Sequence, residues 1–130
     1  MSRENVEVVK SLVAATQRGD WEAALGKYDP AVVLDMSRFP GGGMEAGREG
    51  TRFFRQWFGT WDRLEVTPER FIDAGDHVVV MLRIAGVGKG SGVEISMRSA
   101  DVITVRAGKV IRHVGYLDRS GALQDVGVAE

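Results

Sequence analysis

The sequence predicts an α+β domain in which helices come first and antiparallel strands follow. Up to about residue 61, most apolar side chains recur at the three-to-four-residue spacing of helices. After residue 63, β-branched residues dominate and turns rich in Gly separate them. The 130 residues suit one domain, spanning 1–130, that is large enough to bury a core. Elements in this order place the helices on one face of the sheet.

Capping residues separate two helices near the start of the chain. Residues 3–18 carry apolar side chains at helical spacing. Gly19 suits the left-handed backbone at a helix C-terminus, and Asp20 suits the N-cap of a following helix. The sequence therefore predicts one helix over 3–18 and a second over 21–28, which ends before Pro30.

A short strand, a loop and a third helix are expected next. The strand covers residues 31–36, and the loop passes through the Pro-Gly-Gly-Gly stretch at 40–43. The third helix is predicted over about 47–61, because aromatic residues gather there at spacings that form one broad apolar face. These residues are Phe53, Phe54, Trp57, Phe58 and Trp61.

The second half is predicted to be a sheet of four strands followed by a short helix. The strands are expected at 64–74, 77–85, 93–106 and 109–117. The closing helix is expected to start at an N-cap formed by Asp118 and to end at Gly127.

The hairpin within 99–113 is predicted to bring a carboxyl and an imidazole together. A three-residue loop over 106–108, with Gly at its last position, is a common type I turn with a bulge. That loop sets Asp101 directly opposite His113, and opposed residues have Cβ atoms roughly 4.5–5.5 Å apart. A two-residue loop is the alternative, and it would move His113 to the other face of the sheet.

Composition narrows the classes of function. The net charge of −1 argues against a general nucleic-acid binder. The absence of Cys excludes disulfides, zinc–thiolate sites and thiol nucleophiles, and the two His have no metal-ligand spacing. No apolar run is long enough for a signal peptide or a membrane helix, so a cytoplasmic protein without membrane contact, metal or cofactor is expected.

Four motifs resemble the SnoaL-like branch of the nuclear transport factor 2-like superfamily. They are QRGDWEAA at 17–24, GREG at 47–50, GVGKGSGV at 86–93 and GYLDRSGAL at 115–123. The resemblance implies a cone, in which a curved mixed or antiparallel sheet wraps around the N-terminal helices and leaves an apolar pocket at one end. Members of this superfamily often form homodimers through the outer face of the sheet, and they include both enzymes and non-catalytic binders.

The outer face of the hairpin carries an apolar stripe that fits such a dimer. Val102, Val114 and Tyr116 are expected to point away from the helices. A homodimer is therefore expected as the partner state, together with a small lipophilic molecule in the pocket.

The resemblance also suggests where catalytic groups lie. Matching to steroid isomerases of this fold sets their base at Asp35 and their second acid at Asp101, but their tyrosine position holds Leu12. Matching to epoxide hydrolases sets one aspartate at Asp101, whereas the arginine and second aspartate positions hold Ser99 and Gly115. Neither chemistry transfers completely.

The leading hypothesis is cofactor-free acid/base chemistry on a lipophilic carbonyl compound. Asp101, His113 and Asp35 are the candidate catalytic residues. The candidate substrate-binding residues are Leu12, Phe54, Trp57, Trp61, Met97, Ser99 and Leu117. Two alternatives stay open: a non-catalytic module that binds a hydrophobic ligand, and a dimeric accessory subunit with a pocket plugged by aromatic side chains. In either case Asp101 and His113 form a structural cross-strand bond, and Asp35 is a strand-end carboxylate.

Overall fold

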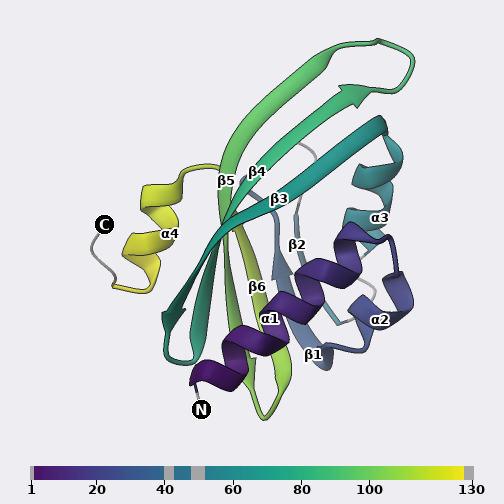
Figure 1. Cartoon of the computed structure of the whole chain (residues 1–130). Coiled ribbons are helices and arrows are strands. Elements are labelled where there is room, and N and C mark those ends of the chain that lie inside the picture. Colours follow the sequence, from purple (N-terminus) through teal and green to yellow (C-terminus); the bar gives the residue numbers. More distant parts are fainter. Residues whose placement is uncertain (1, 40–42, 48–51, 128–130) are drawn as a thin grey trace.

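The computed structural model describes residues 2–39, 43–47 and 52–127 (Figure 1). In these ranges the helices are α1 (Ser2–Gln17), α2 (Trp21–Leu25), α3 (Arg52–Gly59) and α4 (Arg119–Asp125). The strands are β1 (Tyr28–Asp35), β2 (Met44–Ala46), β3 (Trp61–Ala74), β4 (His77–Gly88), β5 (Glu94–Arg106) and β6 (Lys109–Tyr116).

The strands form one mixed sheet that curves around α1. The order within the described chain is β2-β1-β6-β5-β4-β3. β1 runs parallel to β6, and the other neighbouring pairs are antiparallel. Figure 1 shows α1 lying across one side of the sheet, with α2 and α3 beside its C-terminal end and α4 on the opposite side. This arrangement confirms the predicted α+β fold with a curved mixed sheet.

The predicted caps are confirmed, but the second helix is shorter than expected. Gly19 has φ +69°, and the Asp20 side chain accepts a hydrogen bond from the amide of Ala23. α2 ends at Leu25, and Tyr28 is the first residue of β1 rather than the last of a helix. The amide of Val110 bonds to the Lys27 carbonyl and draws the chain into the sheet at this point.

Pro30 is tolerated inside β1 because the ladder is interrupted there. The register between β1 and β6 shifts between Tyr28 and Val33, so Pro30 falls where no regular ladder bond is required of it. The second helix was expected to end before Pro30, but Pro30 lies inside β1.

The predicted third helix is also shorter, and a strand that the sequence did not predict precedes it. β2 covers part of the segment before α3, and residues 40–42 and 48–51 lie outside the described residues. α3 ends at Gly59, where both the amide and the hydroxyl of Thr60 bond to the carbonyl of Trp57. Trp61 then starts β3 and pairs with Gly88.

Two apolar clusters fill the two sides of the sheet. The inner cluster joins α1 to the sheet through side chains such as Val9, Leu12 and Ile103, each at most 2% exposed. The outer cluster joins α4 to the other side, where Ala122 and Leu123 are 0% and 3% exposed. Asp118 caps α4 as predicted, because its carboxylate accepts a hydrogen bond from the amide of Ser120.

The apolar stripe expected at a dimer interface is covered by the chain's own C-terminal helix. Val102, Val114 and Tyr116 belong to the outer cluster and are 1%, 0% and 8% exposed. They face away from α1 as expected, but α4 already buries them. The homodimer stays a prediction, and this stripe no longer supports it.

None of the helices in the described chain is long and apolar enough to cross a membrane. Within the same residues, no group of three or more His, Asp or Glu side chains is arranged to hold a metal ion.

Replacing Leu123 with Ala should lower the free energy of unfolding by about 2–5 kcal/mol, because it opens a cavity between α4 and the sheet. Leu117→Ala is the matched control, since that side chain is 42% exposed and should cost little. Urea unfolding measures both. An unchanged free energy of unfolding for Leu123→Ala, with a change only in the sedimentation coefficient, would contradict the burial of this cluster by α4.

Candidate functional site

The β5–β6 hairpin closes with a two-residue loop, not the three-residue loop favoured from the sequence. Arg106 pairs with Lys109, which leaves Ala107 and Gly108 as the loop. Both have positive φ, +51° and +78°, as in a type I′ turn. The sequence favoured the longer loop because Ala rarely adopts the positive φ that Ala107 has in this turn.

A bulge in β6 returns His113 to the inner face. Val105 pairs with Val110, but Thr104 pairs with Arg112, so Ile111 is an extra residue on β6. One added residue reverses the side on which every later side chain of the strand points. The expectation that a two-residue loop would separate the pair is therefore wrong.

Asp101 and His113 meet as diagonal neighbours. Ile103 lies opposite His113 and Gly115 lies opposite Asp101, so the predicted direct pairing is wrong. Diagonal positions on one face still allow long side chains to touch. His113 Nε2 lies 2.7 Å from Asp101 Oδ2.

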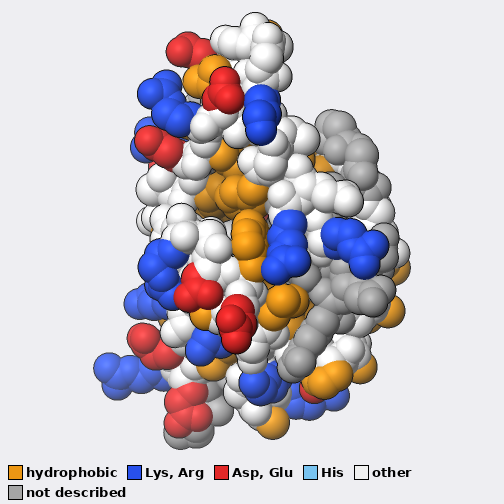
Figure 2. All heavy atoms as spheres, turned by 90° about the vertical axis from the view of Figure 1, so that its right-hand side faces the viewer, with side chains coloured by type: hydrophobic (Ala, Val, Ile, Leu, Met, Phe, Trp, Pro, Cys, Tyr) orange, Lys and Arg blue, Asp and Glu red, His pale blue; other side chains and the backbone are white. Residues whose placement is uncertain are grey.

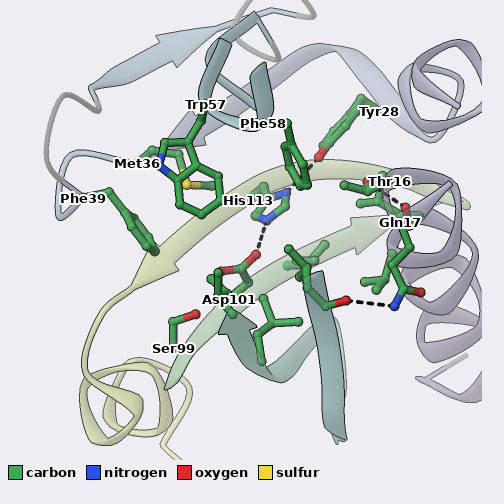
Figure 3. A pocket seen from close by; sticks show the side chains of 16 residues that line it. Thr16, Gln17, Tyr28, Met36, Phe39, Trp57, Phe58, Ser99, Asp101 and His113 are labelled. Carbon is green, nitrogen blue, oxygen red and sulfur yellow. Dashed lines mark hydrogen bonds and ion pairs between the residues drawn. The ribbon is translucent and has the colours of Figure 1, made fainter. Parts of the chain in front are cut away.

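A tyrosine that the sequence analysis did not select completes the arrangement. The hydroxyl of Tyr28 lies 2.9 Å from His113 Nδ1, so both ring nitrogens of the imidazole have partners (Figure 3). The side chains of His113 and Asp101 are 7% and 14% exposed, and Tyr28 is 3% exposed. The β5–β6 hairpin and β1, which is distant from it in sequence, supply this Tyr28–His113–Asp101 relay.

The relay has a defined proton arrangement. Burial, and then the negative charge of Asp101, raise the pKa of the Tyr28 phenol far above its usual value. Tyr28 therefore stays protonated, and its hydroxyl can donate to Nδ1 when that nitrogen carries no proton. An imidazole proton lies on Nε2 and is donated to the Asp101 carboxylate.

The relay lies on the wall of an apolar cavity of about 80 Å³. Figure 3 shows Trp57 and Phe58 extending from α3 toward His113. The polar residues in the lining are Thr16, Gln17, Tyr28, Ser99, Asp101 and His113. Thr16 and Gln17 bond to the backbone carbonyls of Leu12 and Val66.

Two polar atoms of the cavity wall are left for a ligand. The Ser99 hydroxyl is buried without a hydrogen-bond partner in the described structure. Asp101 uses Oδ2 for His113, and its Oδ1 has no partner among the described residues. Buried polar groups are usually satisfied, so this wall can still accept and donate hydrogen bonds.

Gly115 leaves the space that two cavity side chains occupy. A Cβ at this position would lie 2.5 Å from Phe39 Cε2 and 2.8 Å from Met36 Sδ. Both side chains line the cavity, so the glycine opposite Asp101 lets them pack directly against the backbone of β6.

Asp35 does not lie in the cavity wall. Its carboxylate accepts hydrogen bonds from the amide and hydroxyl of Ser37 and pairs with Arg38 at 3.3 Å. Burial alone would raise the pKa of this carboxyl, but the Ser37 bonds and the Arg38 charge outweigh burial and lower it. This arrangement corresponds to the strand-end carboxylate that was the alternative interpretation.

The predicted binding residues divide into two groups. Leu12, Trp57 and Ser99 line the cavity, whereas Trp61, Met97 and Leu117 do not. The side chain of Phe54 lies outside the described residues. Leu117 follows the end of β6 and is 42% exposed, because the true register ends the strand earlier than predicted.

Comparison with known families identifies the family of this chain. The family model for the SnoaL-like domain matches residues 9–113. The chain belongs to the SnoaL-like family. A search of curated proteins found no match for it.

Solved structures share the fold of this SnoaL-like chain over nearly its whole length. An NTF2-like protein from Burkholderia thailandensis E264 is 28% identical with a TM-score of 0.81, covering 92% of this chain and 97% of its own. TerC, co-crystallised with polyporic acid, is 22% identical with a TM-score of 0.78 and coverages of 95% and 98%. A protein with a ketosteroid isomerase-like fold from Catenulispora acidiphila DSM 44928, in complex with trimethylamine, is 20% identical with a TM-score of 0.75 and coverages of 95% and 94%.

Replacing Gly115 with Ala should destabilise the protein by about 1–3 kcal/mol, because the new methyl group displaces Phe39 and Met36. Gly121→Ala is the control: its Cβ would meet Tyr116 at 3.4 Å, an ordinary contact, and Ala favours the helix. Thermal unfolding compares the two. Equal melting temperatures for Gly115→Ala and the wild type would contradict the packing described here.

Proposed function

We propose that this SnoaL-like protein performs cofactor-free acid/base chemistry on a small organic carbonyl compound. The observation that supports it is the buried Tyr28–His113–Asp101 relay on the wall of an apolar cavity. A carboxylate held by an imidazole in apolar surroundings is suited to accept a proton from a bound molecule.

Asp101 is the group that contacts the substrate. Its Oδ1 takes the proton from the carbon next to the carbonyl, and the electron pair of that C–H bond moves toward the carbonyl oxygen to give an enolate. The same carboxyl then returns the proton to another carbon or assists departure of a leaving group. No net oxidation or reduction occurs, so no redox partner is needed.

His113 and Tyr28 act as positioning residues. Both nitrogens of the imidazole are already engaged, so His113 acts through Asp101 rather than on the substrate. Its Nε2–H fixes the second carboxylate oxygen, and the Tyr28 hydroxyl holds the other side of the ring at Nδ1.

The apolar wall of the cavity supports a second candidate, a non-catalytic module that binds a small ligand. At about 80 Å³ the cavity is smaller than the roughly 150 Å³ engineered cavity that holds benzene. Aromatic side chains, Phe39, Trp57 and Phe58, occupy much of its wall. Two structural neighbours carry organic ligands of their own, polyporic acid and trimethylamine.

Exchange of α-hydrogens for deuterium distinguishes the two candidates without knowledge of the natural substrate. The wild type should accelerate loss of the α-hydrogen signal of cyclopentanone in D₂O, followed by proton NMR. Asp101→Asn should reduce this acceleration by about 10²–10⁴-fold, because the base is lost. Asp35→Asn is the matched control and should retain it, since Asp35 lies outside the cavity wall.

The melting temperature of each variant must accompany the rates. An Asp101→Asn protein that stays folded and still exchanges at the wild-type rate would contradict the proposed base. Saturable binding of small ketones with no exchange by the wild type would favour the binding module.

A further inference from the structure

We propose that the cavity is the inner compartment of a longer site, whose outer compartment holds the anionic end of an elongated substrate. The inference rests on the proposed function only in taking the inner cavity as the place where the reacting end binds. It assigns a ligand class: a molecule with an apolar, carbonyl-bearing end and a carboxylate at the other.

A second, larger hollow adjoins the cavity. It is an open groove of about 620 Å³ between the C-terminal end of α1, the start of α2, α3 and β3. The cavity and the groove share Thr16, Gln17, Phe58 and Val66 as lining residues. Figure 2 views the side that carries α2 and α3 and shows apolar side chains gathered in a hollow, with charged side chains around it.

Phe58 separates the two compartments. Its ring packs edge-on against Trp57, which lines the cavity but not the groove, with ring centroids 5.7 Å apart. On the other side its ring packs edge-on against Trp21, which lines the groove but not the cavity, at 5.3 Å. One half-buried aromatic ring therefore forms much of the partition.

Gln17 forms the other part of the partition. Its side-chain amide donates a 2.8 Å hydrogen bond to the carbonyl of Val66 and so ties α1 to β3 at the shared wall. This bond holds one side of the opening in place, whereas Phe58 is held by ring contacts alone among its described interactions. A ring can rotate more readily than a strand can move. We therefore expect Phe58, rather than Gln17, to move when a ligand spans both compartments.

Arg55 is the cation of the groove that is available to an anion. Arg18, Arg55 and Glu65 line the groove. Arg18 lies 3.7 Å from Asp20, whereas neither Arg55 nor Glu65 has an ion-pair partner in the described part of the chain. Arg55 precedes Phe58 by three residues on α3, so the two side chains are neighbours on the helix surface. A carboxylate beside Arg55 would thus lie next to the partition.

Binding of three matched probes tests the proposal. They are heptanoate, heptanamide and heptylamine, which share one narrow apolar chain and differ in charge. The carboxylate should bind the wild type at least about 5-fold more tightly than the amide at low salt. Arg55→Gln should abolish this difference, and Arg63→Gln, an arginine of β3 outside the groove lining, should preserve it.

The indole NMR signals of Trp21 and Trp57 report which compartments are filled. The carboxylate probe should shift both signals, whereas cyclopentanone should shift that of Trp57 alone. Phe58→Ala should raise the affinity for the carboxylate probe by about 3-fold or more, because it opens the partition between the compartments.

Each remaining outcome overturns the proposal. Tighter binding of the amine would assign the groove to cations through Glu65, and equal binding of all three probes would remove the anion site. A shift confined to one indole would mean that the compartments do not form one site. These readouts are independent of α-hydrogen exchange, so loss of exchange with both indoles shifted would refute the proposed catalysis and leave the two-compartment site standing.

Discussion

The fixed imidazole of His113 is the interaction on which the account of the site depends. The ring is held at Nδ1 by Tyr28 and at Nε2 by Asp101, and all three side chains are largely buried. The Asp101 carboxylate can only accept a hydrogen bond, so Nε2 is the nitrogen that donates to it. The relay therefore orients the carboxylate at the cavity wall.

The backbone arranges this relay through two local irregularities. The two-residue turn and the extra residue at Ile111 together restore the inward direction of His113, and the interruption in β1 accommodates Pro30 while Tyr28 stays in the sheet. Gly115, opposite Asp101, gives Phe39 and Met36 room to close the cavity around the carboxyl group. Substitutions at these positions would displace the relay side chains without replacing any of the relay residues.

Much of the fold and two of the three relay residues were predictable from the sequence. Asp101 and His113 were expected on one face because a three-residue loop was counted. The two-residue loop shifts the register by one residue from the predicted one, and the bulge at Ile111 shifts it by one more. A shift of two residues restores the same face, so the prediction was right about the face and wrong about the register. Bulges depend on tertiary context, and no residue type around Ile111 signals one.

The position of Tyr28 in the sheet and the burial of the apolar stripe by α4 could not be predicted from the local sequence pattern. Tyr28 lies between a short helix and a proline, and only its pairing with Val110 on a distant strand places it in the sheet. The apolar stripe of Val102, Val114 and Tyr116 has the same sequence pattern whether a second copy or α4 covers it. Long-range pairing decides both cases, and periodicity carries no information about it.

The protonation state of His113 tests the central claim most directly. Nitrogen-15 NMR of the imidazole in the wild type and in Asp101→Asn distinguishes a protonated Nε2 from a protonated Nδ1. We expect a proton on Nε2 in the wild type, because the Asp101 carboxylate can only accept, and a loss of this preference in Asp101→Asn. A ring that titrates like a free imidazole and exchanges between tautomers in both proteins would contradict it.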